Sequence, residues 1–208
     1  MSTMLIKEIK GQIKLITGLH IGAGNDEVHI GGIDSAVVKD AYGNPYIPGS
    51  SLKGKIRSLL ELSEGSTTGN PSDRVNYPHS LIPIVFGDMS KNSQEFTRVL
   101  FRDAFLSKES IDMLSSDSIL PTEEKSENSI DRIKGVANYP RKIERVIAGM
   151  VFDFSIALRI LDTDNEGQFK DLLKKGFEML EADALGGSGS RGYGKVKFEN
   201  LTYDGDDF

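Results

Sequence analysis

Cysteine is absent from the 208 residues of this sequence, and histidine occurs only three times. Without cysteine the chain has no disulfides, no thiolate zinc sites and no thiolate nucleophile, and little imidazole is left for chemistry. A bound metal ion would have to be held mainly by carboxylates. Carboxylate oxygens favour magnesium or manganese over zinc.

Long apolar segments are missing as well. No stretch approaches the roughly 20 apolar residues that span a bilayer. The first residues, MSTMLIKEIKGQIK, lack the uninterrupted apolar core of a signal peptide. With 38% hydrophobic and 27% charged residues, the composition is typical of a globular protein. We therefore expect a cytoplasmic protein with one domain, which is common at this length.

The sequence also lacks a net positive charge. The formal charge is -6 at pH 7, whereas nucleic-acid-binding proteins usually offset the phosphate charge with a basic surface. RNA binding therefore requires local basic segments. The sequence has three of them, and acidic residues gather elsewhere, at Asp162, Asp164, Glu181, Asp183, Asp204, Asp206 and Asp207.

Alternating apolar residues predict the strands. This period of two is clearest over residues 5–16 and 150–161. Shorter strands are expected at 36–39, 45–48, 97–106 and 195–203, the first two as a hairpin around the turn AYGN. In the strand 97–106, Val99, Phe101 and Phe105 would share one face. Asp103 interrupts that face and must be paired if it is buried.

Two helices are expected between the strands. One begins at Ser50, which we interpret as its N-cap, and has an apolar stripe of Leu52, Ile56, Leu59 and Leu60. The other covers 166–184. The order strand, helix, strand, strand, helix, strand predicts an α+β, ferredoxin-like (RNA-recognition-type) fold. This fold permits RNA as a partner but also hosts unrelated functions.

Two stretches interrupt this pattern. Residues 64–80 are rich in Gly, Ser, Thr, Asn and Pro without periodicity, which indicates a surface loop. Residues 107–149 are polar and irregular and then turn basic, which predicts an insertion that projects from the core.

The first basic segment is PGSSLKGKIR, residues 48–57, which places Lys53, Lys55 and Arg57 in the first turns of a helix. Cations there oppose the helix dipole unless an anion sits at the helix N-terminus. Free backbone N–H groups and the two serines could then converge on one phosphate. The alternative is an ordinary capped helix with solvated lysines.

The second segment is GGSGSRGYGK, residues 186–195. Its glycines, among them Gly187, Gly189 and Gly192, let the backbone approach a ligand closely. Arg191 and Lys195 supply positive charge, and Tyr193 suits a stacked base. The alternative is a helix end followed by a hairpin.

The third segment is the insertion. Its cations are Arg132, Lys134, Arg141, Lys142 and Arg145, interrupted by Asp131 and Glu144. They form either a solvated charged arm or an arm that lies across nucleic acid or a neighbouring subunit.

Asp34, in GGIDSAVV, is the candidate catalytic and metal-binding residue. An aspartate at this place commonly caps a turn. Its functional role would be to bind magnesium or to orient an attacking hydroxyl at an exposed phosphate. His20 and His29 lie near it in sequence and could exchange protons in RNA cleavage, although a polar residue ending a strand is a simpler explanation.

In this order, the segments TGLHIGAG, GGIDSAVVKD, IPGSSLKGKIR, ANYPRKIERV and LGGSGSRGYGKVKF resemble the RAMP superfamily of CRISPR proteins. The resemblance is to the repeating backbone subunit of the type III-A, or Csm, effector complex, and it covers nearly the whole chain. It implies a single RAMP domain over 1–208 with three parts. These are a core of about 1–63, 97–106 and 150–203, a loop insertion of about 64–96, and a thumb-like hairpin insertion of about 107–149.

The resemblance also implies a function. Several copies would form a filament on a CRISPR RNA together with other subunits of the complex, and each copy would cut guide-complementary single-stranded target RNA at regular intervals. Asp34 matches the aspartate that this family requires for cutting, with Mg2+ or Mn2+ as the cofactor and a 2′-hydroxyl as the attacking group. The candidate RNA-binding residues are His20, Lys53, Lys55, Arg57, Arg132, Lys134, Arg141, Arg145, Gly187, Gly189, Arg191, Gly192, Tyr193 and Lys195.

Other functions remain open at this point. Within the family, the chain could be the equivalent subunit of a type III-B, or Cmr, complex, or a RAMP endonuclease that matures the guide as a monomer. Outside it, the chain could be a non-catalytic RNA-binding scaffold in which Asp34 only caps a turn. A metabolic phosphate-binding domain fits less well, because three separate basic and glycine-rich segments suit a polymer.

Overall fold

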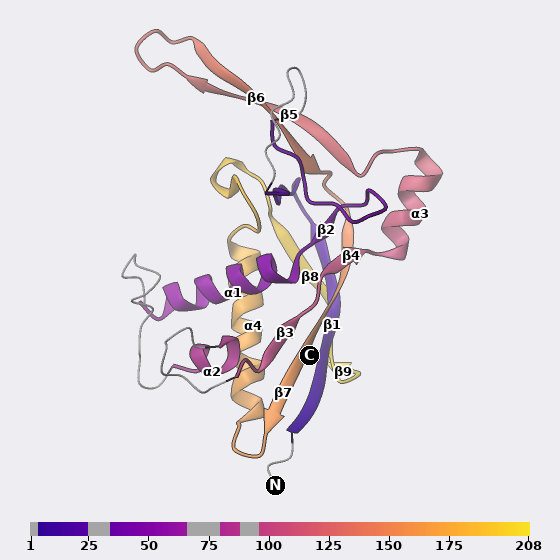
Figure 1. Cartoon of the computed structure of the whole chain (residues 1–208), viewed down its shortest axis with the longest axis vertical. Helices are drawn as coiled ribbons and strands as arrows, with labels where there is room; N and C mark the ends of the chain where they lie inside the picture. Colours follow the sequence, from indigo (N-terminus) through magenta and orange to yellow (C-terminus); the bar gives the residue numbers. More distant parts are fainter. Residues whose placement is uncertain (1–3, 25–33, 66–79, 88–95) are drawn as a thin grey trace.

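Two long strands form the centre of the sheet, β1 (Met4–Leu15) and β7 (Val151–Leu161). They pair antiparallel along their whole length, and every second side chain in their middle is buried, as the period of two predicts. The computed structural model describes residues 4–24, 34–65, 80–87 and 96–208. Figure 1 shows this central pair running along the long axis of the molecule.

Shorter strands extend the sheet on both sides. β3 (Val99–Phe101) and β4 (Ala104–Leu106) pair with β7, and β2 (Tyr46–Ile47) pairs with β4. On the other side, β8 (Val196–Tyr203) pairs with β1, and β9 (Asp206–Asp207) pairs with β8. The resulting order, β2-β4-β7-β1-β8-β9, places each new strand antiparallel to its neighbour. This is the ferredoxin-like arrangement that the element order predicts.

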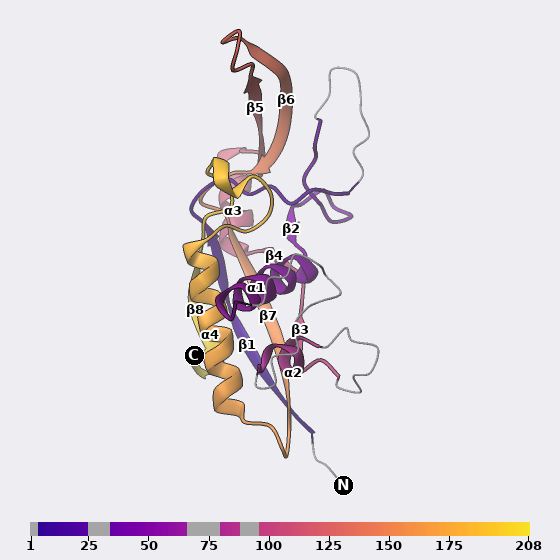
Figure 2. The ribbon, with the colours of Figure 1, turned by 90° about the vertical axis from the view of Figure 1, so that its left-hand side faces the viewer.

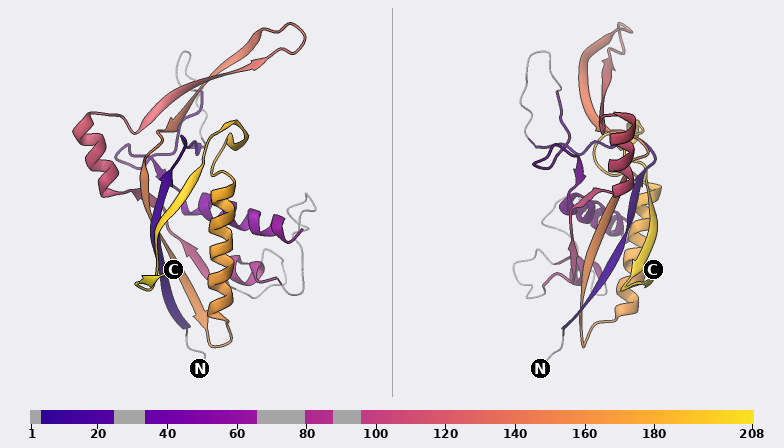
Figure 3. Two further views of the ribbon diagram at one scale, coloured as in Figure 1. Left: turned by 180° about the vertical axis from the view of Figure 1, so that it is seen from behind. Right: turned by 90° about the vertical axis from the view of Figure 1, so that its right-hand side faces the viewer.

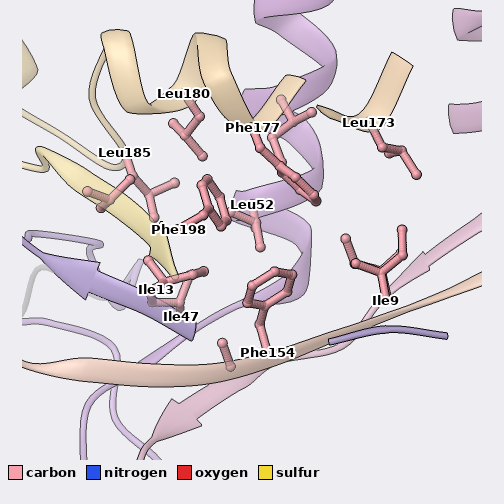
Figure 4. Close-up of a cluster of buried hydrophobic side chains, with 14 of the residues drawn as sticks. Ile9, Ile13, Ile47, Leu52, Phe154, Leu173, Phe177, Leu180, Leu185 and Phe198 are labelled. Atoms are coloured by element: carbon pink, nitrogen blue, oxygen red, sulfur yellow. The ribbon is translucent and has the colours of Figure 1, made fainter. Parts of the chain in front are cut away.

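Two helices cover one face of this sheet, α1 (Gly49–Ser63) and α4 (Glu166–Ala182). Seen from behind, α4 runs along one side of the sheet and α1 crosses behind α4 (Figure 3). The core between them is rich in aromatic rings. The ring of Phe177 on α4 lies 4.6 Å from that of Phe198 and 5.9 Å from that of Phe154 (Figure 4). The apolar stripe predicted for the first helix is confirmed as core, and Phe169, Leu173, Phe177 and Leu180 of α4 are buried as well.

The structure corrects the expected hairpin of 36–39 and 45–48. The turn is real, because the Asp40 carboxylate accepts the N–H groups of Tyr42 and Asn44 at 2.9 Å each. However, the two segments meet only at an isolated bridge between Lys39 and Pro45, and β2 pairs with β4 instead. The reason is that residues 37–39 bond to Glu144, more than a hundred residues later in the chain.

The expected strand 97–106 is also corrected, because it breaks at Asp103 into β3 and β4. The Asp103 carboxylate turns away to accept the N–H of Gly49 at 2.8 Å, which caps α1 from another part of the chain. The N-cap residue is Pro48, so the assignment of Ser50 was wrong. The break also changes the face that Phe105 occupies, and its side chain is 51% exposed.

The region after β4 contains a helix that the sequence did not predict, α3 (Lys108–Asp117), followed by a two-stranded hairpin of β5 (Thr122–Ile130) and β6 (Ala137–Val146). The hairpin projects from one end of the molecule (Figures 1 and 2). It lies within the range 107–149 that was expected to project from the core.

The preceding loop region contains a second unpredicted helix, α2 (Ile82–Phe86). Most of the loop predicted at 64–80 lies outside the described residues. The domain limits proposed from the sequence stay a prediction. In the described part of the chain, no helix is both long and apolar enough to cross a membrane.

Candidate functional site

Four of the sequence segments with candidate residues meet at the base of the β5–β6 hairpin. Leu19, in the loop after β1, exchanges two backbone hydrogen bonds with Val146 at the end of β6, at 3.0 and 2.8 Å. The glycine-rich loop joins from the other side, where the Gly194 N–H donates to the carbonyl of Gly18 at 2.9 Å. Figure 2 shows this loop between the end of α4 and the hairpin. The structure thus brings together segments that are far apart in the sequence.

Asp34 lies at this base. Its carboxylate Oδ2 accepts the backbone N–H of Lys142 at 2.6 Å, and its own N–H donates to the Lys142 carbonyl at 2.9 Å. The side chain is exposed, and Oδ1 has no hydrogen-bond partner in the described part of the chain. Asp34 therefore fixes a backbone turn with one oxygen and presents the other to solvent.

The side chains that the structure describes at this site do not by themselves form a metal site. Among the described residues, no group of three or more His, Asp or Glu gathers to hold a metal ion. One exposed carboxylate does fit a hard cation that takes its other ligands from phosphate oxygens and water, which is how magnesium usually binds.

His20 lies next to this turn, and both of its ring nitrogens are engaged. Nδ1 is 2.7 Å from the carbonyl oxygen of Glu144, so it is the donor, and Nε2 is 3.2 Å from the hydroxyl of Ser35. In the neutral ring, Nε2 then accepts from that hydroxyl. His20 thus ties the loop after β1 to the hairpin, and its contact with RNA stays a prediction. His29 lies outside the described residues.

Glu144 is the buried anchor of the site, with 4% of its surface exposed. Its carboxylate accepts from Lys39 Nζ at 2.6 Å, from Thr122 Oγ1 at 2.7 Å and from the Val37 N–H at 3.0 Å. Burial alone would raise the pKa of Glu144, but these donors hold it below its ordinary value. The sequence showed Glu144 only as an interruption of a basic arm, since its partners are distant in sequence.

The glycines of the glycine-rich loop mostly serve close packing within the protein. Gly194 has a φ of +70°, and a Cβ there would collide with the carbonyl of Leu185. Gly187 donates its N–H to the His20 carbonyl at 2.9 Å, and a Cβ on Gly189 would lie 2.7 Å from Ala184. Gly192, with a φ of +88°, has open space around it and is the glycine best placed for a ligand.

Tyr193 is buried, with 1% of its surface exposed, so the expectation that it stacks on a base is corrected. Its ring lies under two cations of the hairpin, 4.3 Å from Lys125 Nζ and 5.0 Å from Arg145 Cζ. Burial and the neighbouring Glu127 carboxylate raise the pKa of Tyr193 to about 12. Arg145 is partly buried there and pairs with Glu123 at 2.7 Å, so both residues join the loop to the hairpin.

A cleft of about 350 Å³ opens between the hairpin and the glycine-rich loop. Its lining residues are Lys125, Glu127, Asn128, Ser129, Arg141 and Arg191. Arg191 pairs with Glu127 at 2.8 Å, whereas Arg141 has no carboxylate partner among the described residues. Three cations around one cleft suit an anionic backbone.

The cations of α1 differ in availability. Lys53 is half-buried and has no carboxylate partner in the described ranges, and burial and the charge of Arg57 lower its pKa. Lys55 pairs with Asp183 at 2.8 Å. Arg57 is corrected to a structural role, because its side chain is only 12% exposed and binds Glu61 at 2.7 Å and the carbonyl of Gly87 at 2.9 Å. The first N–H of α1 is already bound by Asp103.

The remaining cations lie away from the cleft. Arg132 and Lys134 are exposed at the tip of the hairpin, where the Asp131 carboxylate accepts the N–H groups of Ile133 and Lys134. Lys195 donates its ammonium to the carbonyl of Glu181 and so caps the end of α4. A contact of Lys195 with RNA stays a prediction.

Known proteins share this sequence pattern over most of the chain. The family model described as "RAMP superfamily" matches residues 12–197. The chain is 46% identical over 200 residues to "CRISPR system Cms endoribonuclease Csm3" of Streptococcus thermophilus, which covers 93% of this chain and 87% of the relative. A protein of the same name from Methanocaldococcus jannaschii is 44% identical, with 93% and 78% covered.

Solved structures agree with the fold. A chain from "Crystal structure of Csm3-Csm4 subcomplex in the type III-A CRISPR-Cas interference complex" has a TM-score of 0.60 and 32% identity, covering 95% of this chain and 77% of that one. A chain from "Cryo-EM structure of the Type III-B Cmr-beta bound to cognate target RNA" has a TM-score of 0.65 at 17% identity, covering 95% and 60%. This second likeness concerns the fold alone.

Proposed function

The chain belongs to the RAMP superfamily, and on that premise we propose that it is the guide-RNA-binding backbone subunit of a type III-A CRISPR effector complex and that it cleaves target RNA. The observation that carries the proposal is the position of Asp34. An exposed carboxylate is fixed to the backbone of a projecting hairpin, and the same hairpin contributes to a cleft lined by cations. The endoribonuclease names of the relatives support cutting as its activity.

The guide backbone would run through the cleft between the hairpin and the glycine-rich loop. Arg141 and Arg191 line it, and Gly192 leaves room for the close approach of a phosphate. Lys53 on α1 is a further phosphate ligand, since it lacks a carboxylate partner in the described part of the chain. The projecting hairpin would act as a thumb between guide and target, with Arg132 and Lys134 at its tip.

Cutting would follow the chemistry of the RNA itself. The 2′-hydroxyl oxygen of one nucleotide attacks the adjacent phosphorus and the bond from phosphorus to the 5′-oxygen breaks. The 5′-oxygen takes a proton from water, which gives a cyclic phosphate and a 5′-hydroxyl. Asp34 either accepts the proton of the 2′-hydroxyl or orients this group. A displaced nucleotide places the hydroxyl in line with phosphorus, so positioning supplies part of the rate.

Alternatively, Asp34 Oδ1 would be the protein ligand of Mg2+ or Mn2+, with RNA phosphate oxygens and water as the other ligands. Such a cation stabilises the charge that develops on the phosphate. The partners in this proposal are the CRISPR RNA, single-stranded target RNA, further copies of this chain and other subunits, in a cytoplasmic complex. The likeness to a chain of the type III-A Csm3-Csm4 subcomplex supports an assembly of this kind.

The test is to replace Asp34 with alanine in the assembled complex. We expect cutting of a guide-complementary RNA in magnesium to fall by about 10²- to 10⁴-fold, because a positioned acid or base contributes roughly that much. Binding of the target should change little. Asp40→Ala is the matched control, since Asp40 caps the neighbouring turn and has no part in the site.

A non-catalytic RNA-binding scaffold is the second candidate. The hydrogen bond from the Lys142 N–H to Asp34 favours it, because holding this turn is by itself a sufficient role for the carboxylate. In that case Asp34→Ala and Asp40→Ala would leave cutting equally unchanged. The catalytic proposal would then be abandoned and the RNA-binding part kept.

A further inference from the structure

Glu127 occupies an unusual place in the proposed RNA-binding cleft. It is the one carboxylate among the residues that line this cleft, and its side chain is only 13% exposed. Oε2 lies 2.8 Å from Arg191 Nη1, and Oε1 lies 3.6 Å from Lys125 Nζ. Across the hairpin, its Cα partner is Arg141. One carboxylate thus sits among all three cations of the cleft.

The local backbone directs Glu127 into this position. The pairing of β5 and β6 shifts register between Glu127 and Ser129, and such bulges re-aim side chains. The Tyr193 hydroxyl, Arg191 and Lys125 hold the pKa of Glu127 below its ordinary value against the effect of burial. The carboxylate is therefore ionised at neutral pH and neutralises part of the charge of the cleft.

A carboxylate and a phosphate compete for the same donor. Both accept hydrogen bonds from the guanidinium fork of arginine, and both are attracted by lysine. RNA that enters the cleft must therefore exchange the Arg191–Glu127 contact for an Arg191–phosphate contact. The exchange lowers the gain from any single phosphate, so RNA held by few contacts is disfavoured relative to RNA held by many.

We propose that Glu127 is a specificity-determining residue that holds the place of an RNA phosphate in the free subunit and yields Arg191 when the guide backbone enters the cleft. This inference rests on the proposed function, since it assumes that RNA is the ligand. It gives one acidic residue of a chain of charge -6 a role in RNA binding.

The same strand offers a matched control. Glu124 is also an acidic residue of β5, but it is 53% exposed, pairs with Lys142 at 3.4 Å and does not line the cleft. Glu124→Gln and Glu127→Gln remove the same charge from the same hairpin. Any difference between the two variants therefore reports on the cleft and not on net charge.

The experiment measures binding of the full-length chain to a fluorescent single-stranded oligouridine, over a range of salt concentrations. We expect Glu127→Gln to bind about 3- to 10-fold more tightly than wild type, which corresponds to the loss of one partly buried competitor. The slope of log affinity against log salt should stay nearly unchanged, because Arg191 contacts the same phosphate in both proteins once RNA is bound. Glu124→Gln should change affinity much less.

A second comparison keeps the test valid if one variant folds poorly. In an Arg191→Gln background, Glu127 has lost its main partner, so Glu127→Gln should give no further gain in affinity. Equal affinities for Glu127→Gln and Glu124→Gln, weaker binding by Glu127→Gln, or an undiminished gain in the Arg191→Gln background would each overturn the inference.

Failure of the inference and failure of the proposed function give different results. If the assembled wild-type complex binds and cuts target RNA while Glu127→Gln matches Glu124→Gln, only the inference fails. If the assembled wild-type complex neither binds nor cuts RNA, the proposed function fails with it.

Discussion

In the sheet and its two helices, apolar side chains are buried at the regular spacing of a strand or a helix, so residues close in sequence share one buried face. At the base of the hairpin, by contrast, charged side chains and backbone groups from four distant segments bind one another. Ile9 and Ile13 in the core follow a local period. By contrast, the contacts of Glu144 with Val37 and of Asp34 with Lys142 each join residues more than a hundred positions apart in the sequence. The core therefore contributes most of the stability of the fold, and the base of the hairpin determines where the candidate functional residues lie.

The largest effect on stability should come from the core. Phe177→Ala removes a ring that packs against Phe154 and Phe198, and we expect a loss of about 3–5 kcal/mol in the free energy of unfolding. Urea denaturation followed by circular dichroism measures it. Phe105→Ala, at an exposed position of the same sheet, should lose far less. Similar losses for both would remove the distinction between core and surface.

Glu144→Gln should have the next largest effect on stability. The change leaves Lys39 and two further donors poorly paired, at a cost of about 1–3 kcal/mol. Because the folded-state pKa of Glu144 is lowered, its contribution is present above the unfolded-state pKa of about 4.3 and is lost as pH falls through the folded-state value. The difference from wild type should therefore shrink below about pH 4.

The exposed pair Glu124 and Lys142 serves as the control for this pH dependence. Glu124→Gln should alter stability by no more than about 0.5 kcal/mol at pH 7. If Glu144→Gln were equally mild, the base of the hairpin would not depend on a buried carboxylate.

Two lysines of α1 should differ in their effect on RNA binding, and this difference should be smaller than the effects on stability. Lys53→Ala is expected to weaken RNA binding about 3- to 10-fold and to reduce the salt slope by about 0.7, since one phosphate contact is lost. Lys55→Ala should leave both nearly unchanged, because Lys55 pairs with Asp183. Fluorescence anisotropy with the assembled complex measures both. An equal loss for the two lysines would contradict the assignment of Lys53.

The smallest expected effect is a difference in chemical reactivity between Tyr193 and an exposed tyrosine. Nitration by tetranitromethane needs an accessible phenolate, and Tyr193 is buried with its pKa raised to about 12. At pH 8 it should remain unmodified in the free chain, while the exposed Tyr42 reacts. Peptide mass spectrometry identifies the modified residues. Nitration of Tyr193 as fast as Tyr42 would restore the idea of a ring that stacks on RNA.

The sequence predicted the parts of the fold that depend on local periodicity. β1, β7 and α4 appear where alternation and the helical stripe place them. α3 escaped notice because it is short and only Ser110 of its residues is buried, so its apolar stripe is limited to Ile111 and Leu114. The break at Asp103 was equally hidden, since its cause is a hydrogen bond to Gly49, fifty-four residues earlier.

The same limit applies to the site. The sequence named Asp34, Arg141 and Arg191 as candidates in three separate segments, and the structure brings these segments together. The sequence could not show that Arg57 binds the Glu61 carboxylate and the Gly87 carbonyl, because a free and a paired cation look the same in a sequence. Glu127 and Glu144 were missed for the corresponding reason. A single acid in a polar segment gives no sign of being buried among cations.

The most direct measurement compares target cutting by assembled complexes that contain wild-type chain or Asp34→Asn. Asparagine keeps an oxygen that accepts the Lys142 N–H, so the turn is preserved while the carboxylate charge is removed. A catalytic Asp34 predicts a fall in cutting of at least about 10²-fold with target affinity unchanged. Cutting at the wild-type rate would show that Asp34 only holds the turn and would contradict its catalytic role.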